Sequence, residues 1–310
     1  MLRNLSPRLR TVLQALFVTF LWSTSWVLVK VGLKGIPALP FAGLRYVLAF
    51  VVLLPFAIRG GQLAGLQRLS GATWTRLAVL GLLFYAVTQG TVYWALSYLP
   101  AMTVSLLLNA STLVVALMGI LLLREVPSPI QWAGVILFLG GALAYFHPLD
   151  VPSAQAAGFI LAAVCVLSNA LSSILGRHVN RDPSLDPMTV TVVSMGIGAL
   201  ALLLGGVLVQ GLPHLSLLNW GIIAWLAVVN SAFAFTLWNH TLRTLSATES
   251  SIINNTMLIQ IALLAWLFLG EELTGRQVLG LGLAAAGVLV VQLRWRPRPG
   301  RSADDGQAGA

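Results

Sequence analysis

The chain has 310 residues, of which 58% are hydrophobic and only 9% are charged. A soluble core of this length cannot bury so much apolar surface, so the composition excludes an ordinary soluble protein and indicates an integral membrane protein. The formal net charge of +9 does not indicate nucleic-acid binding, because the basic residues are placed as membrane topology requires.

Ten apolar runs are long enough to cross a hydrocarbon core of about 30 Å as helices. Strands crossing lipid would alternate polar and apolar residues, and stretches such as VVALMGILLL do not. We therefore expect an all-α integral membrane protein. The predicted helices cover residues 11–32, 40–58, 74–97, 102–122, 130–146, 156–176, 187–210, 218–242, 247–269 and 276–294.

The two ends of the chain lie outside this pattern. The opening MLRNLSPRLR followed by an apolar run is similar to a secretory signal, but the run is too long and has no evident small-residue cleavage site. We interpret it as part of the first transmembrane helix. The tail, residues 295–310, has no apolar face to bury and is expected to be disordered.

The placement of the basic residues predicts the orientation. With the N-terminus in the cytoplasm, fourteen arginines fall on the cytoplasmic side and only Lys34 and Arg276 fall outside. This bias is typical of cytoplasmic loops and juxtamembrane segments. We therefore expect a multi-pass protein of the bacterial inner membrane with both termini in the cytoplasm.

An internal repeat relates the two halves of the chain at a shift of 146 residues. The segment LREVPSPIQWAG, residues 123–134, aligns with LGEELTGRQVLG, residues 269–280, and places Glu125 on Glu271. The same shift places Trp74 on Trp220 and Asn109 on Asn255. Each half holds five predicted helices, and an odd number makes the second half enter the membrane from the opposite side. The repeats are therefore inverted.

Two adjacent carboxylates, Glu271 and Glu272, fall in the predicted turn between the last two helices. A catalytic dyad would need a cleft and one carboxyl group with a raised pKa, and a turn at a water interface is expected to provide neither. The alternative is structural, because a carboxylate at the N-terminal end of the next helix is stabilised by the helix dipole by about 0.3 to 1 kcal/mol. We favour the structural interpretation.

Several motifs together resemble the EamA type of the drug/metabolite transporter superfamily. They are the signature FLWSTSWVLVK in the first helix, PFAGLRYVLAF in the second, and an L-x-E turn leading into a Gly-rich helix in both halves. The resemblance covers residues 11–294, and the closest similarity is to bacterial inner-membrane exporters of aromatic amino acids and metabolites. One departure is Trp22-Ser23, where the family commonly has Trp-Gly.

The resemblance implies a ten-helix bundle of two inverted five-helix repeats around a central cavity, with helices 5 and 10 peripheral. The first EamA-like repeat would span residues 11–147 and the second residues 156–294, joined by a linker at 148–155. Inverted-repeat transporters bind their substrates near the midplane at the repeat interface.

Polar side chains inside a membrane are costly, so we expect them to face a cavity or a partner helix. Tyr85, Gln89 and Tyr93 recur every fourth residue and form one helical stripe, which the repeat shift carries to the eighth helix. The substrate-binding candidates are Trp22, Ser23, Trp26, Tyr85, Gln89, Tyr93, Ser105, Asn109, Thr112, Ser168, Asn169, Ser172, Ser231, Phe235, Asn239 and Asn255. The alternative is that Ser and Thr bond helix carbonyls and that the aromatic residues are interfacial anchors.

Few ionisable residues lie within the predicted helices. Lys30 is close enough to a helix end to extend toward the interface, and Arg45, which matches the family's common helix-2 arginine, is interpreted as structural. His240 is a possible gate or proton-sensitive residue, against the alternative of a silent histidine. No predicted helix has a carboxylate in its middle, so we expect facilitated diffusion or exchange rather than tight proton coupling.

We expect no metal site and no cofactor, because Cys165 is the single cysteine and no Cys/His cluster has metal-ligand spacing. We also expect no catalytic residues, since no nucleophile, base or metal cluster converges. The glycines Gly134, Gly141, Gly280 and Gly287 predict close packing, with a monomer or a homodimer formed through helices 5 and 10.

The leading hypothesis is a secondary transporter that exports small neutral or zwitterionic metabolites, aromatic or other amino acids, by alternating access. Its partners would be a small-molecule substrate and the lipid bilayer, with no nucleic acid. A carrier of nucleotide sugars or sugar phosphates is an alternative, although phosphate needs fixed cations and the interior offers only Lys30 and Arg45. An intramembrane enzyme and a non-transporting membrane scaffold are the alternatives from other classes.

Overall fold

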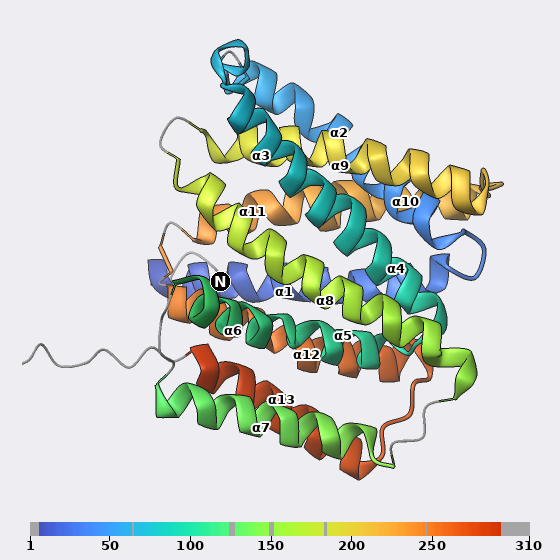
Figure 1. Ribbon diagram of the computed structural model, residues 1–310. Coiled ribbons are helices and arrows are strands. Elements are labelled where there is room, and N and C mark those ends of the chain that lie inside the picture. Colours follow the sequence, from blue (N-terminus) through green and yellow to red (C-terminus); the bar gives the residue numbers. More distant parts are fainter. Residues whose placement is uncertain are drawn as a thin grey trace, which may run out of the picture.

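The chain forms a bundle of helices that run back and forth along one axis (Figure 1). The computed structural model describes residues 6–63, 65–123, 128–148, 152–182, 185–242, 244–245 and 247–292. Within these ranges no strand occurs, and ten helical stretches are long and apolar enough to cross a membrane. The all-α membrane fold predicted from composition is thus confirmed. The predicted disordered tail lies outside the described residues.

The helix bounds agree with the predicted ranges to within a few residues. The first half consists of α1 (Pro7–Gly32), α2 (Ala38–Arg59), a short 3-10 turn η2 (Leu66–Arg68), α3 (Gly71–Gly81), η3 (Leu82–Thr88), α4 (Gln89–Tyr98), α5 (Ala101–Asn109), α6 (Ser111–Leu123) and α7 (Pro129–Phe146). The second half consists of α8 (Ser153–Asn180), α9 (Pro187–Gln210), α10 (Leu217–Ala227), η4 (Val228–Phe233), α11 (Ala234–Thr241), α12 (Ala247–Leu269) and α13 (Gly275–Gln292).

The sequence repeat is also a repeat of structure. Five pairs of equivalent elements begin 146 residues apart: α1 and α8, α3 and α10, η3 and η4, α5 and α12, and α7 and α13. The short elements η3 and η4 are π-helical, so even the irregular part of the third membrane crossing recurs in the eighth.

The helices are arranged in pairs that combine the two halves. α2 packs against α9, α1 against α12, and α7 against α13. Figure 1 shows α7 and α13 together at one side of the bundle and α2 and α9 near the other. This arrangement places α7 and α13, the fifth and tenth crossings, at the periphery.

Glycines make the contact between α7 and α13 very close. A Cβ atom added to Gly141 would lie 2.5 Å from the backbone nitrogen of Ala284, and one added to Gly287 would lie 2.4 Å from the backbone nitrogen of Phe138. Gly134 and Gly280 make equivalent contacts with the opposite helix. The predicted close packing therefore occurs within one chain. A homodimer through these two helices, which stays a prediction, would need their other faces.

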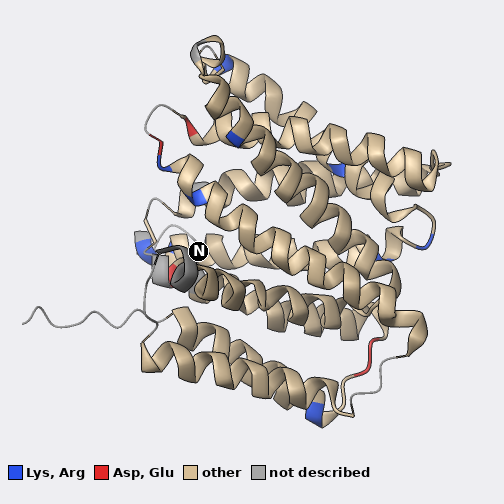
Figure 2. Ribbon diagram, viewed as in Figure 1, with Lys and Arg blue, Asp and Glu red and all other residues tan. Residues whose placement is uncertain are grey.

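Charged residues are distributed unequally between the two ends of the bundle. Lys and Arg residues gather at the end where the N-terminus lies, whereas fewer occupy the opposite end (Figure 2). The basic end includes Arg8, Arg10, Arg59, Arg177 and Arg181, and the opposite end includes Lys34 and Arg276.

Glu271 caps a helix, but not the one that follows it in the sequence. Its two carboxylate oxygens accept hydrogen bonds from the backbone N–H groups of Ala101, at 2.7 Å, and Met102, at 3.2 Å, at the start of α5. The chain can turn toward α5 because Gly270 adopts a φ of 66° after the end of α12, a left-handed conformation that glycine tolerates best. The structural interpretation of Glu271 holds, but its predicted partner was wrong. Its repeat equivalent, Glu125, lies outside the described residues.

Lys30 caps the C-terminal end of α4, the helix that precedes α5. Its Nζ donates hydrogen bonds of 2.8 Å to the carbonyl oxygens of Leu96 and Leu99, at the end of α4. The amino group thus binds unpaired helix carbonyls instead of simply extending to the interface. Together, Lys30 and Glu271 fix the junction between α4 and α5.

We expect Glu271→Ala to lower the free energy of unfolding by about 2 kcal/mol, because two helix N–H groups would lose a charged acceptor. Glu272→Ala is the matched control: its side chain is exposed, and it makes no hydrogen bond within the described part of the chain. Thermal unfolding of the purified variants in detergent measures the difference. Equal midpoints for the two variants would contradict the capping role.

Candidate functional site

A small chamber lies between the two repeats. It has a volume of about 130 Å³ and is lined by residues of α1, α5, α6 and α12: Trp26, Ser105, Leu108, Asn109, Ser111, Asn254, Met257, Leu258 and Ile261. We call it the central chamber. Leu108 and Asn254 are repeat equivalents, so matching parts of the two halves face the same space. All its lining residues are uncharged.

The helix that forms one wall of the central chamber is interrupted. The predicted crossing over residues 102–122 is divided at Ala110 into α5 and α6. Asn109, the last residue of α5, donates from its side-chain nitrogen to the carbonyl oxygen of Ser105 at 2.8 Å. Interrupted membrane helices are tolerated where the backbone is buried in protein or lines a cavity, and transporter sites commonly contain them. The apolar pattern of this segment contains no Pro or Gly at the break.

The two π-helical segments lie in the crossings that carry the predicted polar stripes. η3 contains Tyr85 and ends directly before Gln89, whereas η4 contains Ser231. In each segment a side-chain hydroxyl donates a hydrogen bond to the carbonyl oxygen five residues earlier. The Thr88 hydroxyl bonds the carbonyl of Leu83, and the Ser231 hydroxyl bonds the carbonyl of Leu226. π-helical segments occur frequently at functional sites.

Three of the predicted site residues line the central chamber: Trp26, Ser105 and Asn109. Thr112 lies one residue past Ser111 and is half-buried. Whether these residues bind substrate stays a prediction.

The predicted stripe on the third crossing does not line the central chamber. Tyr93 is buried and accepts a hydrogen bond from Arg45 Nη1 at 2.8 Å. Tyr85 is buried against Tyr46, with ring centroids 5.5 Å apart. Gln89 is half-buried, and its amide makes no hydrogen bond within the described ranges. The stripe thus combines two packed tyrosines with one amide that has no hydrogen-bond partner among the described residues.

The predicted residues of α8 connect this helix to the first repeat. Ser168 accepts a hydrogen bond from Thr88 at 2.8 Å, and Asn169 donates to Ser111 Oγ at 3.0 Å. Ser172 donates to the carbonyl oxygen of Asn169. Because Ser111 lines the central chamber, Asn169 lies just behind its wall.

The predicted residues of α1 and α11 form an aromatic cluster beside the chamber helices. The Trp22 ring lies 5.2 Å from that of Phe235 and 5.3 Å from that of Trp238, centroid to centroid. Ser23 is fully buried and bonds Gln260 Oε1 at 2.9 Å. The serine that replaces the usual glycine therefore has a polar partner on α12.

The remaining predictions fall elsewhere. Asn255 donates to Gln292 Oε1 of α13 at 2.9 Å and, unlike its repeat equivalent Asn109, does not line the central chamber. His240 is exposed near the end of α11. Ser231 bonds Arg45. The side chain of Asn239 lies outside the described residues.

Four polar residues near the site were not among the predictions. Ser111 and Asn254 line the central chamber. Asn230 is fully buried, with its Oδ1 atom unpaired, and its backbone carbonyl accepts the Trp22 indole N–H at 3.1 Å. Gln260 bonds Thr19, Ser23 and Thr256. A mid-membrane amide, the signal used for Gln89 and Asn109, would also have identified Asn230 and Gln260.

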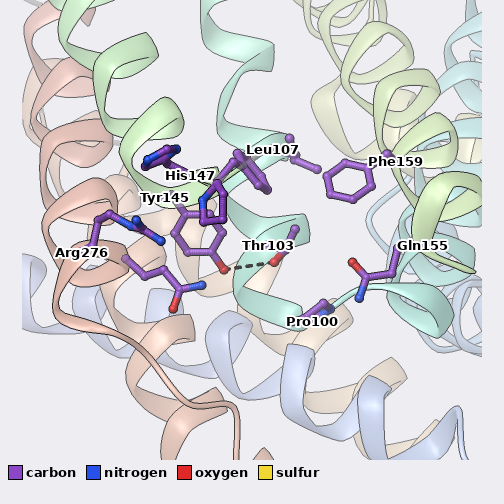
Figure 3. A pocket seen from close by; sticks show the side chains of 11 residues that line it. Pro100, Thr103, Leu107, Tyr145, His147, Gln155, Phe159 and Arg276 are labelled. Carbon is purple, nitrogen blue, oxygen red and sulfur yellow. Dashed lines mark hydrogen bonds between the residues drawn. The ribbon is translucent and has the colours of Figure 1, made fainter. Parts of the chain in front are cut away.

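A larger chamber of about 630 Å³ lies near the bundle end that carries Glu271. Figure 3 shows its lining, with the Tyr145 and Thr103 hydroxyls joined by a hydrogen bond of 3.0 Å. Its residues come from α5, α7, α8, α13 and adjoining turns: Pro100, Thr103, Leu107, Tyr145, Phe146, His147, Pro148, Gln155, Phe159, Arg276 and Gln277.

The helix α5 separates the two chambers. Thr103 and Leu107 face the larger one, whereas Ser105, Leu108 and Asn109 face the central one. Sites for small molecules usually occupy about 300–1,000 Å³. The larger chamber is in this range and the central chamber is below it, so a metabolite would need the central chamber to widen.

Metal-ligating residues are not clustered in the part of the chain that the structure covers: no group of three or more His, Cys, Asp or Glu side chains occurs there. The arrangement of uncharged hydrogen-bonding and aromatic groups can bind a small molecule.

Comparison with known proteins identifies similar sequences over the whole bundle. The model of the EamA-like transporter family matches residues 9–146 and residues 156–293. A probable amino-acid metabolite efflux pump of Salmonella typhimurium is 27% identical over 92% of this chain and 95% of its own length. An uncharacterized transporter of Archaeoglobus fulgidus is 26% identical, over 85% of this chain and 90% of its own length.

Two further similarities concern location and fold. An uncharacterized inner membrane transporter of Escherichia coli, YedA, is 25% identical over 90% of each chain. A solved crystal structure with 20% sequence identity covers 91% of this chain and 97% of its own, with a TM-score of 0.64. The structural similarity supports the fold alone.

Proposed function

Since this chain belongs to the EamA-like transporter family, we propose that it is a secondary transporter that exports small neutral or zwitterionic metabolites by alternating access. It is a multi-pass protein of the inner membrane. The observation that carries the proposal is the central chamber, which uncharged residues of both repeats line together. A site between two inverted repeats can open to either side when one repeat moves against the other.

Amino acids, aromatic ones in particular, are the substrate class we propose. Trp26 lines the central chamber, and Trp22, one helical turn earlier on α1, forms an aromatic cluster with Phe235 and Trp238 of α11. Aromatic pairs contribute about 0.5–1.5 kcal/mol beyond the burial of their area. Two of the relatives are named as probable amino-acid metabolite efflux pumps.

Uptake into proteoliposomes tests the substrate class. We expect the reconstituted protein to transport radiolabelled phenylalanine or tryptophan faster than protein-free liposomes do, and to transport a sugar phosphate no faster. Transport of the sugar phosphate alone would replace the amino-acid proposal by a phosphorylated-sugar carrier. Transport of neither compound would contradict both the aromatic amino-acid proposal and the phosphorylated-sugar alternative.

The orientation we propose puts the basic, N-terminal end of the bundle and both termini in the cytoplasm. Cysteines at Gly275 and Gly71 test it, because both positions have open space for a side chain and lie at opposite ends of the bundle. Cys165 is buried and would be replaced by Ala to remove any background. In spheroplasts, a membrane-impermeant maleimide should label Gly275→Cys, whereas Gly71→Cys should react only after lysis. The reverse pattern would contradict the orientation.

A further inference from the structure

Arg45 is a buried cation in the membrane-spanning part of the bundle. It lies seven residues after the start of α2 at Ala38, roughly 10 Å along the helix at 1.5 Å per residue. Its side chain is only 6% exposed. An ionisable residue at such a position is costly, and it usually marks a functional site.

The partners of Arg45 are neutral and come from both repeats. Its Nε donates to Ser231 Oγ of η4 at 3.2 Å, and its Nη1 donates to Tyr93 Oη of α4 at 2.8 Å. The guanidinium carbon lies 5.1 Å from the centre of the Tyr46 ring. The positive charge is therefore held in place by two hydroxyl groups and one aromatic face.

No carboxylate neutralises this charge among the described residues. The ion pair that the structure contains there joins Arg8 and Glu249, at the N-terminal end of the bundle. A guanidinium group has five N–H donors, and Arg45 uses two of them with described partners. Nη2 donates to none of the described residues, and it is not among the side-chain atoms that are fully buried without a partner.

The free N–H donors of Arg45 are chemically suited to an anion. A guanidinium binds a carboxylate through two parallel hydrogen bonds, and such charge-assisted bonds are about twice as strong as neutral ones. Lys30 does not offer the same opportunity, because its amino group already binds the carbonyl oxygens of Leu96 and Leu99. One fixed cation can neutralise one carboxylate, whereas a doubly charged phosphate ester would leave a buried net charge.

We propose that Arg45 binds the carboxylate group of the transported substrate, and that Tyr93 and Ser231 position its guanidinium group. This assignment rests on the proposed transport function and narrows its substrate class to zwitterionic amino acids and other monocarboxylates. Arg45 does not line the central chamber, so the carboxylate would be bound at a separate point of the substrate path. Because Tyr93 belongs to the first repeat and Ser231 to the second, a carboxylate bound at Arg45 would contact the interface of the two.

Equilibrium binding to the purified protein in detergent tests the assignment without requiring transport. The probes are L-phenylalanine and L-phenylalaninamide, and L-tryptophan and its amide, which differ only in the carboxylate. We expect the unmodified protein to bind each acid at least tenfold more tightly than its amide. Arg45→Gln should bind the acid at least tenfold more weakly and lose the preference, whereas Arg45→Lys should keep part of it.

A purely structural arginine gives a different result. A folded Arg45→Gln protein that still prefers the acid by tenfold would overturn the assignment, and so would an unmodified protein without any preference for the acids. Size-exclusion profiles and thermal midpoints establish whether each variant is folded. If Arg45→Gln does not fold, the assignment is tested by comparing acid and amide binding in the unmodified protein and in Arg45→Lys. Carboxylate-dependent binding without transport in liposomes would refute the proposed function but not the assignment of Arg45.

Discussion

Leu108→Trp is expected to reduce transport to less than a tenth of the unmodified rate while leaving the protein folded. Leu108 is half-buried and lines the central chamber, whose volume is only about 130 Å³. An indole ring there would fill the space that a substrate needs and would keep the site apolar. The loss should appear as a lower maximal rate in proteoliposomes, at an unchanged amount of reconstituted protein.

The matched control for this variant lies in the same membrane crossing. Leu117 is on α6 and is 43% exposed on the bundle surface, so Leu117→Trp should leave the transport rate unchanged. Normal transport by a folded Leu108→Trp protein would show that the substrate path does not pass through the central chamber.

Gly141→Ala should destabilise the protein by about 3 kcal/mol, at the upper end of the usual cost of overpacking. The added methyl carbon would lie 2.5 Å from the backbone nitrogen of Ala284 and 2.6 Å from the carbonyl oxygen of Gly280. These are backbone atoms, so the clash is relieved only if α7 and α13 separate. Denaturant unfolding of the purified protein measures the loss.

The neighbouring glycine provides a control of opposite sign. A Cβ atom at Gly140 meets no atom within 4 Å, and replacing a helix glycine by alanine stabilises by about 0.5–1 kcal/mol. If the glycine faces instead joined two chains, Gly141→Ala would convert dimers to monomers with little loss of fold stability. Size-exclusion chromatography with light scattering distinguishes these results.

The positions of the helices could be predicted from the sequence because lipid imposes strong constraints. Each crossing needs a long apolar run, and the 146-residue shift fixes equivalent positions in the two halves. The glycines of α7 and α13 were identifiable because small residues at regular spacing allow helices to approach closely.

The interruptions inside the helices could not be predicted in this way. The break at Ala110 and the π-helical segments η3 and η4 occur in runs that are still apolar enough to read as continuous membrane crossings. They depend on tertiary contacts, such as the hydrogen bond from Thr88 to Ser168 on α8. A hydropathy pattern contains no information about these contacts.

The hydrogen-bond partners of the polar residues could not be predicted from the sequence either. Asn109 and Asn255 are equivalent in the repeat, yet only Asn109 lines the central chamber, because Asn255 bonds Gln292 of α13. Glu271 was recognisable as a helix-capping carboxylate, but its reach to Ala101 depends on how α12 and α5 pack. Residue type indicated a polar role, and the fold selected the partner.

Counterflow in proteoliposomes tests the central claim most directly. Liposomes that contain the reconstituted protein are loaded with unlabelled phenylalanine and diluted into buffer that contains a trace of the labelled amino acid. A carrier that works by alternating access should accumulate label transiently above its equilibrium level, and Leu108→Trp should abolish this overshoot. The contrary result is that protein-containing and protein-free liposomes take up equal amounts of label. If this holds for phenylalanine and for every other neutral or zwitterionic amino acid, the proposed transport function is contradicted.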